Sequence, residues 1–241
     1  MPPVPRALAF DVFGTVVDWR NSIAREVAPV LATAGRDDLD PHHFADQWRA
    51  RYVPAMMAAN RTREASGSTD FVKLDTLHRA MLDDLLGAVA LDLDEATRTD
   101  MVLGWHRLDP WPDTVEGLTR LKTRFPIVTL SNGNISMIVA MAKRAGLPWD
   151  AVLGAEVAGQ YKPAPYAYQA TAAALDITPG ELCLVAAHRA DLAAARAAGL
   201  LTAFVHRPME YGGRTAPDLK AEQIWEFSAT SFTDLADQLG C

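Results

Sequence analysis

Short apolar segments that alternate with longer amphipathic ones constrain the fold of this chain more than any other feature. The segments expected to form strands are the opening of 7–15, then 125–130, 150–156, 181–187 and 200–205. Strands that are apolar almost throughout are buried on both faces, as in parallel sheets covered by helices. The alternation therefore predicts an α/β fold with a doubly wound, Rossmann-like parallel sheet.

Amphipathic patterns typical of helices separate these strands. They cover 115–124, 135–146, 165–177 and 191–199. Gly146 and Gly199 end Ala-containing patterns, where glycine suits the left-handed residue that follows many helices. We expect the helices to end at these two glycines.

One long stretch, 17–107, breaks this alternation. It shows no convincing strand and four helical patterns, at 21–35, 41–61, 70–89 and 94–108. We expect a helical domain over 17–107, inserted directly after the first strand of a core made of 1–16 and 108–241.

The chain of 241 residues is acidic, with 23 Lys and Arg against 30 Asp and Glu and a formal net charge of −7. Nucleic-acid and membrane surfaces need clustered Lys and Arg, so neither partner is expected. Two cysteines, Cys183 and Cys241, are too few for a disulfide framework or a zinc cluster. The N-terminus lacks a signal-peptide pattern and no apolar run is long enough to cross a bilayer, so a cytoplasmic protein is expected.

Polar side chains stand after the predicted strands, at Asp11, Ser131, Asn132, Lys162 and Asp191. Ligands of doubly wound sheets bind beyond the carboxyl ends of the strands. Taken singly, the Ser-Asn pair and Asp191 fit helix N-caps, and Lys162 fits a solvated loop. Together they predict a crevice with two carboxylates, an ammonium group and small hydrogen-bonding side chains.

The segments around these residues resemble the four motifs of the haloacid dehalogenase superfamily. DVFGTVVD at 11–18 resembles the first motif, in which a strand leads to an Asp nucleophile and a Gly-Thr turn. TLSNG, YKP and LVAAHRADLAAARAAGL resemble the second, third and fourth motifs, in the same order. The resemblance implies that 17–107 is the small cap domain of that superfamily.

The residue two positions after the nucleophile separates the reaction classes of this superfamily. Phosphatases resemble D-x-D, where the second Asp is a general acid, whereas this chain has Phe13. Phenylalanine cannot protonate a leaving alkoxide, but a halide leaves as a stable ion and needs no proton. The chain therefore resembles the L-2-haloacid dehalogenase branch, which implies no metal and no other cofactor.

The resemblance to this branch implies a reaction in two steps. Asp11 would attack the halogen-bearing carbon, release halide and form an ester, which water would hydrolyse at the Asp11 carbonyl. Lys162 would keep Asp11 ionised, because a nearby opposite charge favours the carboxylate. Thr15 would help hold that carboxylate, and Asp191 would pair with Lys162.

Anion-binding residues follow from the same resemblance. Ser131 would hydrogen-bond the substrate carboxylate, and Asn132 would hold the departing halide together with Arg49 from QWRARY. On spacing alone, Arg49 fits a solvated helix face beside Asp46, and the match to the cap helix of the branch favours the halide site. Tyr168, six residues after the motif lysine, matches a tyrosine of the branch.

The fourth motif departs from the branch pattern S-S-N-x-x-D, because residues 186–191 read A-A-H-R-A-D. His188 takes the place of the asparagine, and we expect it to orient Asp191 or the hydrolytic water. This variant is similar to a subgroup with members that act on small haloacids, including fluoroacetate. A small halide pocket edged by Trp19, Phe13 and His188 is therefore expected.

The leading interpretation is a hydrolase acting on carbon–halogen bonds, of the (S)-2-haloacid dehalogenase type. It would convert short 2-haloalkanoic acids, fluoroacetate included, to 2-hydroxy acids and halide. A Mg²⁺-dependent phosphatase or phosphonatase of the same superfamily is the alternative, and a non-catalytic binding protein using the same crevice is the third. The resemblance alone implies a homodimer.

Overall fold

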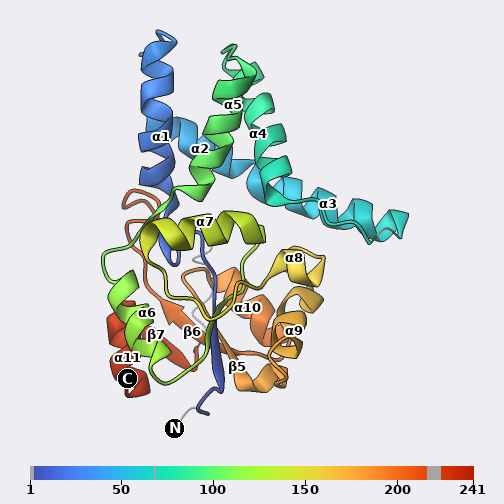
Figure 1. Ribbon diagram of the computed structural model, residues 1–241, viewed down its shortest axis with the longest axis vertical. Helices are drawn as coiled ribbons and strands as arrows, with labels where there is room; N and C mark the ends of the chain where they lie inside the picture. The colour runs from blue at the N-terminus through green and yellow to red at the C-terminus, as the bar shows by residue number, and fades with distance from the viewer. Residues whose placement is uncertain (1–2, 68, 216–223) are drawn as a thin grey trace.

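The computed structural model describes residues 3–67, 69–215 and 224–241 of the chain. Five parallel strands form the central sheet, in the spatial order β4-β1-β5-β6-β7. They are β1 (Ala7–Phe10), β4 (Ile127–Thr129), β5 (Leu182–Ala186), β6 (Leu201–Val205) and β7 (Phe227–Ala229). In Figure 1 β1 runs from the N-terminus at the bottom toward a group of helices at the top, so the carboxyl ends of the parallel strands face those helices.

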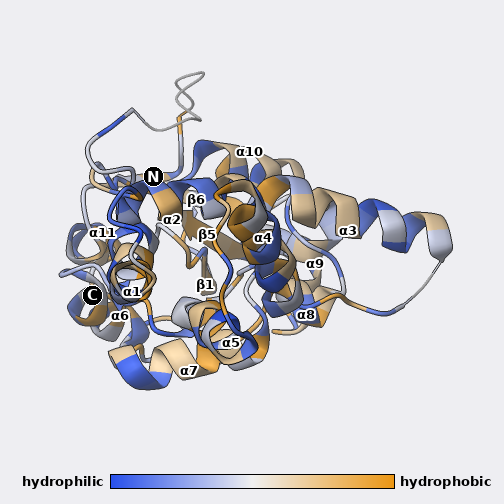
Figure 2. Ribbon diagram, turned by 90° about the horizontal axis from the view of Figure 1, so that it is seen from above, coloured by the Kyte–Doolittle hydropathy of each residue, from blue (hydrophilic) through white to orange (hydrophobic). Residues whose placement is uncertain are grey.

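Side chains of the sheet alternate between two hydrophobic clusters. In β1, Leu8 and Phe10 belong to one cluster, and Ala7 and Ala9 belong to the other. The first cluster is covered by α6 (Thr114–Lys122), α7 (Ile135–Ala145) and α11 (Phe232–Leu239), and the second by α9 (Pro165–Ala173) and α10 (Arg189–Ala197). Seen from above, the strands lie between these groups of helices (Figure 2). The predicted doubly wound fold is confirmed.

Helices dominate the stretch between β1 and α6, as predicted. They are α1 (Trp19–Thr33), α2 (Pro41–Ala50), α3 (Tyr52–Ser66), α4 (Leu74–Ala88), α5 (Glu95–Leu103) and the 3₁₀ helix η1 (Gly104–His106). A short ribbon was not predicted: β2 (Val17–Asp18) pairs antiparallel with β3 (Asp109–Pro110). We propose the helices between these two strands as the cap domain, and Figures 1 and 2 both show α3 extending away from its other helices.

The helical pattern at 41–61 forms two helices, not one, and the chain changes direction at Arg51. Pro54 lies in the first turn of α3, where its missing N–H removes no helical hydrogen bond. Continued as one helix, the chain would place Pro54 in the interior, where its ring clashes with the preceding turn. The proline therefore starts a new helix and lets α3 leave the direction of α2.

The predicted strand at 150–156 is wrong as a regular strand. Only isolated bridges join Ala151 and Gly154 to the β4 side of the sheet, and α8 (Ala155–Ala158) begins directly afterwards. The Thr129 hydroxyl donates to the carbonyl of Leu153 at 2.8 Å and accepts from its N–H at 3.0 Å. At Leu153 a side chain thus takes the place of backbone partners, between the two bridges where backbone hydrogen bonds do form.

The sequence pattern did not predict β7 or α11, nor the 3₁₀ helix η2 (Pro179–Glu181). The segment 206–220, HRPMEYGGRTAPDLK, has a sequence typical of a loop. Its part 206–215 forms turns, and 216–220 lies outside the described residues. Among the helices that the structure describes, none is both long enough and apolar enough to cross a membrane.

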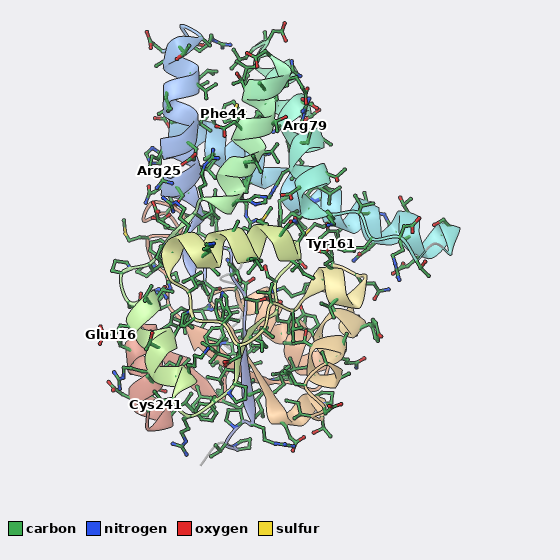
Figure 3. All side chains as sticks on the ribbon, in the orientation of Figure 1. Arg25, Phe44, Arg79, Glu116, Tyr161 and Cys241 are labelled. Atoms are coloured by element: carbon green, nitrogen blue, oxygen red, sulfur yellow. The ribbon has the colours of Figure 1, made fainter. Side chains whose placement is uncertain are left out.

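Among the polar contacts that join the proposed helical cap to the core, two lie on opposite sides of the molecule. Arg25 of α1 forms an ion pair with Asp109, which also accepts from Arg144 of α7 at 2.7 Å. On the other side, the Asn60 amide of α3 donates to the carbonyl of Tyr161 at 2.9 Å and accepts from its N–H at 3.0 Å. Figure 3 shows Arg25 at the left and Tyr161 at the right of the region where the cap and the core meet.

Candidate active site

Asp11 follows β1 directly, and its two carboxylate oxygens have different partners. Oδ1 accepts from Nζ of Lys162 at 3.0 Å. Oδ2 accepts from the Thr15 hydroxyl at 2.7 Å and lies 3.1 Å from Nδ1 of His188. Asp11 is 7% exposed, so its charge is balanced mainly by these neighbours.

A tight turn after Asp11 positions Thr15. Gly14 within it has φ +87°, a conformation that side-chain-bearing residues rarely adopt. The backbone N–H of Ala187, at the end of β5, donates to the Thr15 hydroxyl oxygen at 2.9 Å. The hydroxyl therefore points its own hydrogen at Asp11.

Lys162 lies between two carboxylates, as predicted for a Lys-Asp pair. Its Nζ is 3.0 Å from Asp11 Oδ1 and 2.5 Å from Asp191 Oδ2, and the Lys162 side chain is 6% exposed. The Tyr168 hydroxyl donates to Asp191 Oδ1 at 2.7 Å, and the backbone N–H of Lys162 donates to Asn132 Oδ1 at 2.8 Å. The loops that carry Asp11 and Asn132 and the helices α9 and α10 thus hold Lys162 in place.

The charged groups of this cluster stabilise one another's ionised forms. Burial disfavours the Asp11 carboxylate, but the charge of Lys162 and the hydrogen bond of His188 outweigh burial and hold the pKa of Asp11 well below its ordinary value. Burial likewise disfavours the ammonium, but Asp11 and Asp191 raise the pKa of Lys162 above its ordinary value. Asp11 is therefore ionised at neutral pH.

His188, the N-cap residue of α10, bridges Asp11 to a second buried carboxylate. Its Nε2 lies 2.9 Å from Oε1 and 3.1 Å from Oε2 of Glu210, whose side chain is 4% exposed. Oε1 of Glu210 also accepts from the indole N–H of Trp19 at 3.1 Å. Ionised carboxylates only accept hydrogen bonds, so both ring nitrogens of His188 donate and the ring is an imidazolium.

The electrostatics of His188 agree with that assignment. Burial disfavours the charge, but Glu210 and Asp11 outweigh it and raise the pKa of His188 well above its ordinary value. Burial of Glu210 is outweighed in turn by His188, which lowers the pKa of that carboxyl. The expectation that His188 orients Asp191 is wrong, because both ring nitrogens are engaged elsewhere.

Arg49 of α2 is held by aromatic rings. Its guanidinium carbon lies 3.9 Å from the ring centre of Tyr52, 5.5 Å from that of Trp19 and 5.6 Å from that of Phe13. Nη1 of Arg49 is buried without a hydrogen-bond partner in the described part of the chain. A buried cationic donor without an acceptor is costly, so an anionic ligand fits this position.

A cavity of about 760 Å³ brings cap and core residues together at the carboxyl ends of the strands. This volume lies within the range of small-molecule sites. The predicted residues that line it are Asp11, Trp19, Arg49, Asn132, Lys162, Tyr168, His188 and Asp191. The alternative that Arg49 lies on a solvated helix face is excluded, because Arg49 lines the same cavity as Asp11.

Comparison with known proteins agrees with this geometry. The sequence profile of the haloacid dehalogenase-like hydrolases matches residues 5–199. The chain belongs to this hydrolase family. A solved structure of a defluorinating L-2-haloacid dehalogenase is 45% identical, with a TM-score of 0.92 over 100% of both chains.

Curated relatives of this haloacid dehalogenase-like hydrolase fall into two activity classes. An (S)-2-haloacid dehalogenase of Xanthobacter autotrophicus is 30% identical over 84% of this chain and 75% of its own length. A phosphoglycolate phosphatase of Neisseria gonorrhoeae is 32% identical over 82% of this chain and 78% of its own length. Overall likeness therefore shows the family, and the residues of the site must separate the reactions.

Three of the predicted binding residues lie differently from expectation in this hydrolase. Phe13 is 2% exposed, does not line the cavity, and packs against Tyr52 and Trp105 beneath Arg49. Ser131 is fully buried behind the lining, and its hydroxyl accepts from the N–H of Gly133 at 3.0 Å. Trp19 does line the cavity, but Glu210 takes its indole N–H, so that group is unavailable to a halide.

The donor set around Asp11 is dominated by cations. Nζ of Lys162 occupies the space between the Asp11 and Asp191 carboxylates. Within the described ranges, no group of three or more His, Cys, Asp or Glu is arranged to hold a metal ion.

Sequence reasoning missed two residues of the site. Tyr52 stands three positions after Arg49, a helical spacing that could have indicated contact between them. Glu210 stands in the turn-rich segment HRPMEYGG, and no local pattern there distinguishes it from a solvated loop carboxylate. Its importance follows from contacts with residues that are 22 and 191 positions away.

Proposed function

We propose that this protein is a hydrolytic dehalogenase that converts short 2-haloalkanoic acids, fluoroacetate included, to 2-hydroxy acids and halide. The observation that carries the proposal is the Asp11 carboxylate, kept ionised by Lys162 in a cavity where Nη1 of Arg49 has no hydrogen-bond partner among the described residues. A nucleophile and an anion site in one cavity suit a reaction that attacks an anionic substrate and releases another anion. Recognition is local, because the chain as a whole is acidic.

In the first step, Oδ1 of Asp11 attacks the carbon that bears the halogen. Oδ1 has one hydrogen-bond donor, Lys162, whereas Oδ2 has two contacts, Thr15 and His188. The less engaged oxygen is the better nucleophile. The electron pair of the carbon–halogen bond leaves with the halide, and an ester links Asp11 to the substrate. Orientation within a closed site can contribute about 7–11 kcal/mol to such a displacement.

In this proposal, Arg49 and Asn132 bind the two anions of the reaction, which are the haloacid substrate and the released halide. Oδ1 of Asn132 is taken by the Lys162 N–H, which leaves its NH₂ end to donate. The planar Arg49 guanidinium is fixed against Tyr52, so its direction is set before ligand binds. The substrate-carboxylate role of Ser131 stays a prediction, since its hydroxyl hydrogen would have to reach past the cavity lining.

In the second step, water attacks the carbonyl carbon of the Asp11 ester. Asp191 lines the cavity and is oriented by Tyr168 and Lys162, so it is placed to take a proton from that water. Cleavage between the Asp11 carbonyl carbon and its ester oxygen releases the 2-hydroxy acid. Asp11 then carries one oxygen from water.

Two measurements test the proposal. Chloro-, bromo- and fluoroacetate and the 2-chloropropionate enantiomers are incubated with the enzyme, and released halide is measured by ion chromatography. A single turnover in H₂¹⁸O should then place the label in the peptide that contains Asp11. Label found only in the product after that first turnover would contradict the ester mechanism.

A phosphatase is the second candidate, because the Neisseria relative is as similar in sequence as the dehalogenase. Phe13 argues against it, since the place of a general acid holds a buried ring that cannot protonate an alkoxide. Addition of EDTA or Mg²⁺ to both assays separates the candidates. Phosphate release that depends on Mg²⁺, without halide release, would favour the phosphatase.

We also propose a cytoplasmic homodimer. Cys183 and Cys241 are both free thiols, as is typical of reducing compartments. Light scattering coupled to gel filtration checks the oligomeric state, for which the support is the family resemblance.

A further inference from the structure

Glu210 is a buried carboxylate that the two-step mechanism leaves without a task. It comes from the turns after β6, and its 4% exposed side chain accepts hydrogen bonds from Trp19 and His188. Gly14 makes room for it, because a Cβ there would lie 3.0 Å from Oε2 and even closer to Oε1. The fold therefore holds a negative charge against Nε2 of His188.

Two donors converge on the same oxygen of Asp11. The Thr15 hydroxyl is 2.7 Å and Nδ1 of His188 is 3.1 Å from Oδ2, on the carboxylate edge away from Lys162. If Oδ1 forms the ester, Oδ2 is its carbonyl oxygen. That oxygen gains a negative charge when water adds to the carbon, and donors at about 2.7–3.1 Å from such an oxygen stabilise the transition state.

We propose, on the basis of the dehalogenase function above, that Glu210 keeps His188 protonated so that it donates to the oxyanion of the Asp11 ester during hydrolysis. His188 is a catalytic residue in this view, since it touches the reacting oxygen. Glu210 is a positioning residue that acts through His188.

The proposed step balances as follows. The water oxygen bonds to the Asp11 carbonyl carbon, one water proton goes to Asp191, and the carbonyl electron pair moves onto Oδ2, where Thr15 and His188 donate. On collapse, the bond between the carbon and Oδ1 breaks. Oδ1 leaves as the alkoxide of the product and takes the proton from Asp191. The other water proton leaves the regenerated carboxyl group for solvent, and His188 keeps its proton throughout.

The charges around the imidazole support a donor that stays protonated. Burial opposes the charge, but Glu210 and Asp11 together outweigh it and raise the pKa of His188 well above its ordinary value. When Asp11 becomes an ester and loses its charge, Glu210 still faces Nε2. The further charged groups that act on this pair or on Asp11 are Lys162, Arg49 and Arg207.

The test separates the two half-reactions with Glu210→Gln, which keeps the shape and removes the charge. Wild type and variant are mixed with excess chloroacetate in a quenched-flow apparatus, and halide and the mass of the Asp11 peptide are followed. We expect the variant to keep a burst of one halide per site, then to turn over about 10²-fold more slowly as the ester accumulates. The burst amplitude counts the folded sites.

Glu226→Gln is the matched control, because Glu226 is a partly buried carboxylate paired with Arg196 outside the cavity. It should show neither the burst nor an accumulated ester. If Glu210→Gln does not fold, His188→Asn carries the test, since it keeps an amide donor without the charge. That variant should also accumulate the ester.

The pH dependence of ester hydrolysis distinguishes an electrostatic role of Glu210 from a role in packing. In wild type, ester hydrolysis should fall as pH rises through the raised pKa of His188, and in Glu210→Gln this fall should move toward the ordinary value of about 6.5. Loss of both half-reactions together, without ester, would assign Glu210 a structural role and overturn the inference. So would a fall in wild-type hydrolysis at low pH that disappears in His188→Asn, because it would make His188, in place of Asp191, the proton acceptor. No halide from any acid would refute the dehalogenase function itself.

Discussion

Gly14→Ala tests how the turn after Asp11 and the Glu210 carboxylate depend on each other. Gly14 has φ +87°, and a left-handed conformation costs about 1–2 kcal/mol with a side chain. The new Cβ would also overlap Oε1 of Glu210, so that side chain must move away from His188 and Trp19. A hydrogen bond to a charged group contributes about 1.5–3 kcal/mol. We expect the free energy of unfolding to fall by about 2.5–5 kcal/mol.

Gly146→Ala provides the control for this variant. Gly146 has φ +70° at the end of α7, and no atom lies within 4 Å of its added Cβ. It carries the same kind of backbone strain without the overlap, so a loss of about 1–2 kcal/mol is expected. Urea unfolding at pH 7 measures both variants. Equal losses would refute the reasoning, because the overlap with Glu210 would then contribute nothing.

Perturbations at four further residues test the site. Asp11→Asn should lower halide release at least about 10⁴-fold, measured by ion chromatography, since it removes the nucleophile. Lys162→Met removes the ammonium group that opposes the effect of burial, so the pKa of Asp11 should rise. The pH below which halide release is lost should then move upward when initial rates are measured against pH. An unchanged loss of rate at low pH would contradict this. Arg49→Lys should lower kcat/KM by up to about 30-fold, equivalent to about 2 kcal/mol of contact with Tyr52, and Arg49→Met should lose more. The pKa of His188 is raised on folding, so its contribution to the free energy of unfolding is full below about pH 6.5 and is lost as pH rises through the raised value. His188→Asn should therefore make the free energy of unfolding, measured with urea, depend less on pH in that range.

Much of the core could be predicted from the sequence, because it depends on local periodicity. The apolar run of β1 and the caps at Gly146 and Gly199 need only neighbouring residues to be recognised. The prediction of a regular strand at 150–156 failed for a non-local reason, since the Thr129 hydroxyl takes both backbone groups of Leu153 and interrupts the ladder there. Apolar composition alone could not show that a side chain from β4 would intervene.

The residues of the site also divide into those that the sequence predicted and those whose contacts it could not show. Motif spacing identified Asp11, Lys162 and Asp191, and the structure brings them within hydrogen-bond distance of one another through Lys162. Spacing could not show what His188 contacts. Its neighbour in the motif is Asp191, but its ring turns to Asp11 and to Glu210 from a distant turn.

The sequence by itself determined the class of fold, the insertion of helices after the first strand and the carboxylate that we propose as the nucleophile. These properties follow from the period of apolar residues and from the chemistry of single side chains in a recognisable order. Only the tertiary structure decided which groups are charged, which donors face Asp11 Oδ2 and that Arg49 shares the cavity. Protonation depends on burial and on charges within a few ångströms, and the fold brings those charges together from positions far apart in the chain.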